Sequence, residues 1–131
     1  MPIMLPGFNI DRSRMPEPVI DEGPMVGRVA LLGADLPGLR PRLLCAQGDP
    51  VKKGQAVFVD RAHPDIAFVA PLTGIVDSIT LGPRRSLSAL VIRADENPAE
   101  AEPVAVAAST ATELRSTLLS HGFWPSFLTR P

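Results

Sequence analysis

Residues 48–76 constrain the fold of this chain most, because short apolar runs alternate there with closely spaced turns. The segment opens with a Gly-Asp-Pro turn and contains two apolar runs, residues 55–59 and 66–70. Glycine permits positive φ, aspartate bonds the nearby backbone and proline presets its own φ, so all three favour tight turns. Short β-rich runs separated by such turns predict a compact unit of antiparallel strands.

The whole chain is predicted to be mainly β, with an extended N-terminal arm and one C-terminal helix. The expected strands are residues 27–32, 42–46, 55–59, 66–70, 75–81 and 87–94. Residues 1–24 carry five prolines and no sustained periodicity, which favours an extended arm. The expected organisation is therefore an arm at 1–24, a β domain at 25–94, an acidic linker at 95–108, and a helix beginning a further domain at 109–131.

The helix is predicted from its capping pattern. Thr110 and Glu113 have the spacing of a capping box, and Ala111, Leu114 and Leu118 recur on one helical face. The sequence therefore predicts one helix in the C-terminal part of the chain.

An apolar cluster follows the helix. Gly122 favours a helix stop, and Phe123, Trp124 and Phe127 come directly after it. These aromatic side chains have no evident partner in the residues that remain, so we expect them to face a further domain. A domain fragment of a longer protein is favoured over a stand-alone module.

Alternation within the expected strands predicts the core. Its candidates are Val29, Leu31, Leu44, Val51, Val57, Phe68, Val76, Ile79, Leu90 and Ile92. Gly74 is expected in a tight turn with positive φ, so valine should be tolerated less well there than at Gly82.

Length and charge exclude several classes of protein. A chain of 131 residues fits one domain that buries roughly two-thirds of its unfolded surface. Its 13 basic and 14 acidic residues give a net charge of −1, which offers no electrostatic footprint for nucleic acid. No apolar run approaches the roughly 20 residues of a membrane span, and no signal-peptide pattern is present.

Cys45 is the single cysteine of the chain, so no internal disulfide can form. It lies in an apolar run, which favours a buried, reduced thiol over a reactive one. This pattern agrees with a cytoplasmic location.

No familiar catalytic, nucleotide-binding or metal-binding motif is present, and we expect no catalytic residue. His63, between two aspartates, is interpreted as part of a solvated loop rather than as a metal or acid–base site. His121 is interpreted as a helix-end residue. Arg84 and Arg85 form a basic loop tip that could hold a phosphate or an acidic partner, although exposed arginines are ordinarily solvated.

Two halves of a known motif lie in residues 48–76. The pattern GDxVxxGQxxF, a hairpin and APxxGxV resemble the half-motif of biotinyl and lipoyl domains, which are barrel-sandwich hybrids. The structural positions of this motif are Gly48, Asp49, Val51, Gly54, Gln55, Pro71 and Gly74. Arg61 stands at the predicted hairpin tip, where a carrier domain has its modified lysine, and a guanidinium cannot form that amide. The scaffold is therefore expected without the swinging cofactor.

The ordered landmarks as a set resemble a more specific family, the N-terminal part of the A subunit of the sodium-translocating NADH:quinone oxidoreductase. The landmarks are Pro18-Val19-Ile20 with Gly23-Pro24, Val29 to Gly33, Gly38-Leu39-Arg40-Pro41, Gly48-Asp49, Val51 to Gln55, Ala70-Pro71 with Gly74 and Val76, Arg85 with Leu87, Gly122-Phe123-Trp124, and Thr129-Arg130-Pro131. The C subunit of the Rnf electron-transport complex shares the half-motif. That family also carries cysteine-rich cluster-binding segments, so the quinone-reductase family is preferred.

The resemblance implies a structural and docking part of a larger machine. In that family, electrons pass from NADH to ubiquinone through FAD, FMN, riboflavin and iron–sulfur centres on other subunits, coupled to sodium export. The A subunit is implied to bind no redox cofactor itself and to lie on the cytoplasmic face of the membrane, against the membrane-embedded subunits. Arg84, Arg85, Phe123, Trp124 and Phe127 are candidate docking residues. Ubiquinone remains a further candidate partner, without an assigned residue. The alternative function is an unmodified biotinyl-like or lipoyl-like binding module, or an electron-transport component like the C subunit of the Rnf complex.

Overall fold

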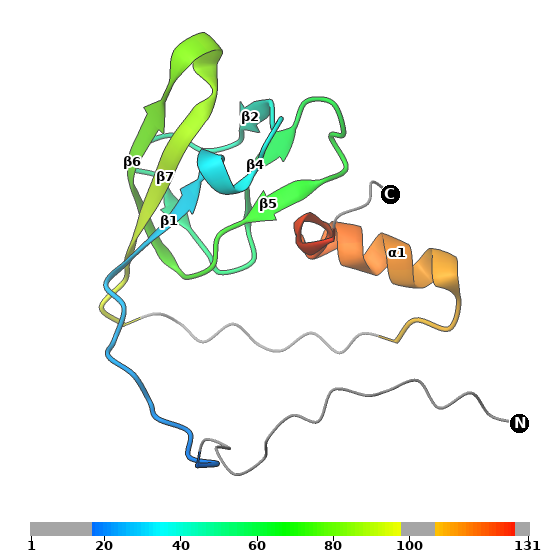
Figure 1. The fold of residues 1–131 in the computed structure, drawn as a ribbon, viewed down its shortest axis with the longest axis horizontal. Helices are drawn as coiled ribbons and strands as arrows, with labels where there is room; N and C mark the ends of the chain where they lie inside the picture. Colours follow the sequence, from blue (N-terminus) through cyan, green and yellow to red (C-terminus); the bar gives the residue numbers. More distant parts are fainter. Residues whose placement is uncertain (1–16, 98–106, 128–131) are drawn as a thin grey trace, which may run out of the picture.

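A computed structural model describes residues 17–97 and 107–127, and this part of the chain is mainly β (Figure 1). A four-stranded antiparallel sheet has the order β1-β7-β6-β3, and a three-stranded antiparallel sheet has the order β2-β4-β5. The strands are β1 Arg28–Leu32, β2 Pro41–Leu43, β3 Pro50–Val51, β4 Ala56–Asp60, β5 Ala67–Val69, β6 Gly74–Leu81 and β7 Leu87–Ala94. The helix α1 spans Ala111–Ser120, and single 3-10 turns lie at η2 Gly33–Asp35, η3 Pro83–Arg85 and η4 Trp124–Ser126.

The hydrophobic core draws side chains from both sheets. Its buried members are Val51, Val57, Phe58, Ile66, Phe68, Ala70, Val76, Leu87, Leu90 and Ile92. Phe58 and Phe68 are cross-strand partners, and their rings stack with centroids 4.7 Å apart. Aromatic pairs of this kind stabilise a sheet beyond the area that they bury. The stacked pair therefore ties β4 to β5 inside the core.

The two halves of the sequence motif bind each other through the backbone. Gly48 N–H donates to the Val76 carbonyl over 2.8 Å, and Val76 N–H donates to the Asp49 carbonyl over 2.9 Å. A second pair of bonds, each 2.8 Å long, joins Gly54 N–H to the Ala70 carbonyl and Ala70 N–H to the Gln55 carbonyl. The motif thus holds the end of β5 and the start of β6 against the turns that flank β3.

Side chains of the motif satisfy the remaining donors of these turns. The Asp49 carboxylate accepts from Ala46 N–H at 2.8 Å, and the Gln55 side-chain carbonyl accepts from Lys52 N–H at 3.0 Å. Gly54 has φ +83°, a conformation that glycine adopts without strain. Each of these residue types is therefore needed for backbone geometry.

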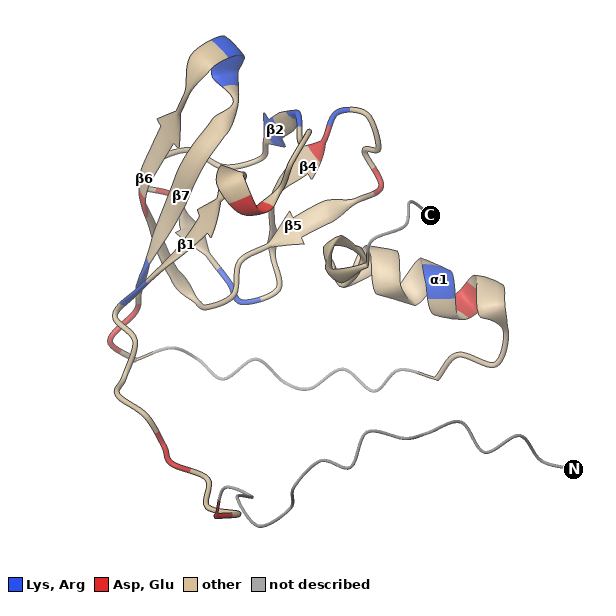
Figure 2. Ribbon diagram, in the orientation of Figure 1, with Lys and Arg blue, Asp and Glu red and all other residues tan. Residues whose placement is uncertain are grey.

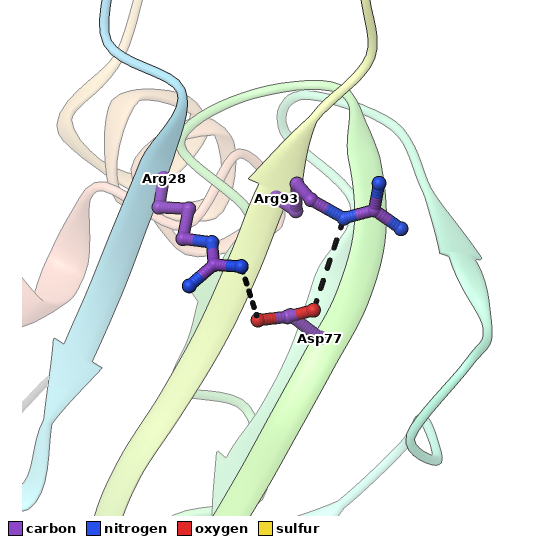
Figure 3. Close-up of polar contacts among 3 residues, drawn as sticks. All are labelled: Arg28, Asp77 and Arg93. Carbon is purple, nitrogen blue, oxygen red and sulfur yellow. Dashed lines mark ion pairs between the residues drawn. The ribbon is translucent and has the colours of Figure 1, made fainter.

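A bulge in β6 changes which of its residues face the core. The β6–β7 register shifts between Val76 and Ser78, so that Asp77 is the extra residue. Val76 lies in the core and Ile79 packs against it, although strict alternation would place them on opposite faces. Arg28 and Arg93 face each other across β1 and β7, and the Asp77 carboxylate lies 3.7 and 3.8 Å from them (Figure 3). This aspartate offsets a like-charge pair that would otherwise destabilise the sheet.

Most predicted strands agree with the observed ones, and Leu87–Ala94 has the predicted bounds. The prediction that Leu44 lies in the core is wrong, because its side chain is 50% exposed. Leu43 and Cys45 pack against the core instead, and side chains of an extended chain alternate between faces, so Leu44 points outward. Five buried apolar side chains were missed by the prediction: Phe58, Val59, Ile66, Ala70 and Leu87.

The helix has the predicted capping box, with Thr110 accepting from Glu113 N–H and Glu113 accepting from Thr110 N–H. No helix residue is buried, and Leu114 on the apolar face is 48% exposed. The contact with the β domain comes from the end of the helix, where Leu119 packs against the core. Figure 1 shows η4 and this end of α1 beside β5.

A Schellman motif ends the helix and turns the chain toward β5. Phe123 N–H donates to the Leu118 carbonyl at 2.9 Å, and Gly122 N–H donates to the Leu119 carbonyl at 3.1 Å. Gly122 has φ +70°, and a Cβ there would collide with a methyl group of Val69. Gly122 is thus required both by the helix end and by its close approach to β5.

The structure retains the expectation that Gly74 is less replaceable than Gly82, for a different reason. Gly74 does not have positive φ; it is a buried strand residue whose Cβ would collide with the Arg93 carbonyl. A Cβ at Gly82 would meet two serine hydroxyls at 3.0 Å, and these can rotate away. We expect Gly74→Val to lower the free energy of unfolding by about 3 kcal/mol, and Gly82→Val by clearly less. Urea unfolding followed by circular dichroism checks this order, and equal midpoints would contradict it.

A second glycine substitution tests the docking of the C-terminal segment. We expect Gly122→Ala to weaken that docking by about 1 kcal/mol or more, because it adds both backbone strain and a collision with Val69. Trp124 fluorescence should shift to longer wavelength while the β domain keeps its circular-dichroism spectrum. Gly38→Ala is the matched control, since Gly38 has φ +78° and nothing within 4 Å of its Cβ position. An unchanged Trp124 spectrum in Gly122→Ala would rule out this account.

Candidate functional site

Arg61 lies at the start of the connection between β4 and β5. β4 ends at Asp60 and the turn of the loop comes at Pro64 and Asp65, so Arg61 is not at the tip, contrary to the sequence-based placement. Its N–H donates to the Arg40 carbonyl at 2.8 Å, which extends the pairing of this edge toward β2. The connection contains no lysine, and its arginine is fixed beside a neighbouring strand.

Asp60 is the one buried charged residue among those described, with 2% of its surface exposed. Its Oδ1 accepts from Ala62 N–H at 3.1 Å, which turns the chain after Arg61. A buried carboxylate is tolerated only when it is hydrogen-bonded, so Asp60 serves the loop backbone.

Five arginines gather around one open groove of about 770 Å³. We call it the arginine groove; it is lined by Arg40, Arg42, Arg61, Arg84 and Arg85, together with Gly38, Leu39, Pro41, Leu43, Leu81, Pro83 and Ser86. Figure 2 shows basic residues at the tip of the β6–β7 hairpin, near β2 and after β4, all toward one end of the domain. Among the described residues, no aspartate or glutamate lines the groove. The predicted basic tip is therefore one wall of a larger cationic surface.

Arg84 and Arg85 occupy an unusual backbone conformation. Their φ angles are 55° and 60°, in the left-handed region that favours glycine. The loop is closed by Gly82 N–H donating to the Ser86 carbonyl at 2.8 Å and Ser86 N–H donating to the Pro83 carbonyl at 3.1 Å. Each left-handed arginine costs about 1 kcal/mol relative to an unstrained residue. The loop thus presents two side chains where glycines would fit with less strain.

The arginines of the groove take no part in the ion pairs seen within residues 17–97 and 107–127. Both ion pairs in these ranges belong to Asp77, with Arg28 and Arg93. Those two arginines lie near the Ala94 end of β7, whereas Arg84 and Arg85 lie next to its Leu87 end. The two basic regions are consequently separated by the length of the hairpin.

The aromatic residues at the C-terminal end divide into two groups. Trp124 packs against the core, and its ring centroid lies 5.4 Å from that of Phe127. Phe123 and Phe127 remain 58% and 50% exposed. The β domain therefore supplies a partner for Trp124 that the sequence did not reveal, while two phenylalanines stay on the surface.

The histidines do not form a metal site with other described residues. No group of three histidine, cysteine, aspartate or glutamate side chains within 17–97 and 107–127 is arranged to hold a metal ion. His63 contributes its carbonyl to the loop, accepting from Ile66 N–H at 2.9 Å. His121 Nδ1 lies 2.9 Å from the Thr117 carbonyl at the helix end, where the sequence placed it. None of the helices in the described ranges is long and apolar enough to cross a membrane.

Residues 4–95 match the family described as the NqrA N-terminal barrel-sandwich hybrid domain. The chain belongs to this family. The predicted barrel-sandwich hybrid is thereby confirmed, with its strands in two antiparallel sheets. Within the NqrA N-terminal domain, the reciprocal backbone bonds of residues 48–76 are the local basis of the fold.

Relatives along nearly the whole chain are named as the A subunit of Na(+)-translocating NADH-quinone reductase. The protein of Neisseria meningitidis serogroup A is 39% identical over 130 residues, that of Mannheimia succiniciproducens 36% over 129, and that of Serratia proteamaculans 40% over 132. Each comparison covers 95% of this chain and 29% of the relative. The chain thus spans less than a third of the length of these relatives.

Sequence reasoning found Arg61, Arg84 and Arg85 but missed that they share a groove with Arg40 and Arg42. The signal available was the Arg-Pro-Arg run at residues 40–42, on a strand whose partner is β4. Pairing of Pro41 with Asp60 and of Arg42 with Val59 brings this run beside Arg61. Because that pairing is non-local, the run by itself did not identify the groove.

The thiol of Cys45 is partly buried, and its Sγ lies 3.5 Å from the Val57 carbonyl, to which a protonated thiol can donate. Burial, and secondarily the negative charge of Asp49, raise the pKa of the Cys45 thiol above its ordinary value. The raised pKa favours the neutral thiol in the folded chain. The neutral Cys45 thiol therefore stabilises the folded chain. This stabilisation is fully present at pH values below the thiol pKa of the unfolded chain, and it is lost as the pH rises through the thiol pKa of the folded chain.

We expect the alkylation rate of Cys45 to rise with pH about a midpoint above that of the urea-unfolded chain, since the thiolate is the nucleophile. Asp49→Asn should lower the folded midpoint while its side-chain carbonyl can still accept from Ala46 N–H. Iodoacetamide kinetics followed by intact mass measure both midpoints. A folded midpoint at or below the unfolded one would contradict this assignment.

Proposed function

We propose that this chain is the N-terminal domain of the A subunit of a sodium-translocating NADH:quinone reductase, with a structural and docking role. The observation that carries the proposal is the family match over residues 4–95, together with relatives of that name along 95% of the chain. The proposal places the domain at the periphery of the complex, on the cytoplasmic face of the membrane.

The same proposal gives the domain no redox centre of its own. In a carrier domain of this fold a lysine in the hairpin connection would hold the cofactor, whereas residues 61–66 contain no lysine and Arg61 stands at the start of the loop rather than at its turn. A permanently protonated guanidinium cannot replace that lysine amine. The FAD, FMN, riboflavin and iron–sulfur centres of the complex would lie on other subunits, and we assign no residue of this chain to ubiquinone.

Docking is proposed to use the surface beside β5. Phe123 and Phe127 are exposed there, next to Trp124, which packs on the core. Aromatic residues are enriched at the buried centres of protein interfaces. The Schellman turn fixes the direction of this segment, so it presents the two phenylalanines on a defined support. The proposed partners are the membrane-embedded subunits.

The proposal is tested with the full-length protein that contains this chain, co-expressed with the other subunits of the complex. We expect the unaltered protein to co-purify with the membrane subunits in detergent, and Phe123→Ser/Phe127→Ser to reduce its recovery about tenfold or more. Leu44→Ser is the matched control, because Leu44 is also 50% exposed but lies near β2, away from the proposed surface.

Co-purification is quantified by the ratio of subunits on a gel, after circular dichroism has shown that the variants fold. If Leu44→Ser is recovered as well as the unaltered protein and the double variant is not, the contact lies at Phe123 and Phe127. Failure of the unaltered protein to co-purify would refute membership of the complex. Equal recovery of all variants would refute the aromatic surface alone.

A further inference from the structure

The arginine groove has the features of a ligand site, beyond any docking role of the domain. Five arginines line it, and none of the described residues that line it is acidic. We propose that the groove binds a small organic anion that carries a diphosphate group. This proposal does not depend on membership of the sodium-translocating complex, because it rests on the groove residues alone.

The groove differs in charge from the chain as a whole. The chain as a whole carries a net charge of −1, so a groove with five arginines and no carboxylate is a strong local departure from that average. The nearest acidic neighbour in sequence, Asp60, is buried and hydrogen-bonded to the Ala62 amide. Like charges gathered in one concave site repel one another, and a bound anion offsets that repulsion. The groove therefore attracts anions more strongly than the surface around it.

The arginines of the groove favour an anion with phosphate groups. A guanidinium presents a planar fork of donors that matches the oxygens of a phosphate or carboxylate. The arginines come from three elements of the fold, with Arg42 on β2, Arg61 after β4 and Arg84 at the hairpin tip. One phosphate cannot accept from five such forks at once, whereas two linked phosphates offer charge and oxygens to all three walls.

The apolar lining and the volume of the groove suit a ligand with an organic part. Leu39, Leu43 and Leu81 also line the groove. The volume of about 770 Å³ lies within the range of about 300–1,000 Å³ that small-molecule sites occupy. Apolar lining with a few convergent charged groups suits a ligand that joins a diphosphate to a less polar body.

The hairpin tip supplies an independent observation. Arg84 and Arg85 both hold left-handed φ angles, a strain that glycine would relieve. Strained non-glycine residues cluster at active sites and ligand clamps, so this strain points to a functional use of the loop. Replacing both with glycine should remove two guanidinium groups without destabilising the loop, which makes the substitution a clean probe of binding.

The experiment is isothermal titration calorimetry of the full chain with ADP, with inorganic pyrophosphate and with inorganic phosphate, at physiological ionic strength. We expect one saturable site for ADP and for pyrophosphate, with a dissociation constant below about 1 mM and phosphate binding weaker. Arg84→Gly/Arg85→Gly should weaken ADP binding by about tenfold or more, since each charge-assisted bond contributes about tenfold. The midpoint of thermal unfolding of this double variant should not fall below that of the unaltered chain.

The matched control is Lys52→Gln/Lys53→Gln, which removes the same charge from exposed residues outside the groove. Binding that survives in the control and is lost in the glycine variant supports the site. Equal weakening in both variants would show non-specific attraction and overturn the proposal.

Two further results would also overturn it. If neither ADP nor pyrophosphate binds at millimolar concentration, the groove holds no diphosphate. Binding of a glutamate-rich peptide with no response to ADP would mean that the groove takes an acidic protein segment instead.

Discussion

The fold depends on the reciprocal backbone bonds between the two halves of residues 48–76. Gly48 and Val76 close one end of this segment, and Gly54 and Ala70 close the other. These bonds join the edge of one sheet to the end of the other, since β3 belongs to the four-stranded sheet and β5 to the three-stranded sheet. With both ends fixed, the two faces can bury Val51, Val76 and Phe68 against one another. Because backbone groups buried without partners are costly, the turn residues are constrained as strictly as the core.

Local patterns predicted much of this architecture, and non-local pairing explains what they missed. Turn residues located the strands, and the capping box located α1, because both depend on neighbours in sequence. The exposure of Leu44 and the partner of Trp124 depend on which segments meet in space. The groove shows the same limit: Arg84 was visible as a basic tip, but its proximity to Arg42 follows from strand pairing that no local pattern encodes.

The connection between β4 and β5 and the arginine groove lie at the same edge of the domain. Arg61 follows β4 and lines the groove, while its backbone bonds to Arg40. The aromatic surface beside β5 is built differently, by a helix end that contacts the barrel through Trp124 and Leu119. The domain therefore has two distinct candidate surfaces, one charged and one apolar.

The bulge at Asp77 also determines how the long hairpin can move. Sliding β6 by one residue along β7 would carry Val76 out of the core and would separate Asp77 from Arg28 and Arg93. The hairpin is thus held at one register near its base, and the height of its tip above β2 is fixed by the number of residues beyond the bulge. An insertion or deletion between Ser78 and Leu81 would change the width of the groove without touching any arginine.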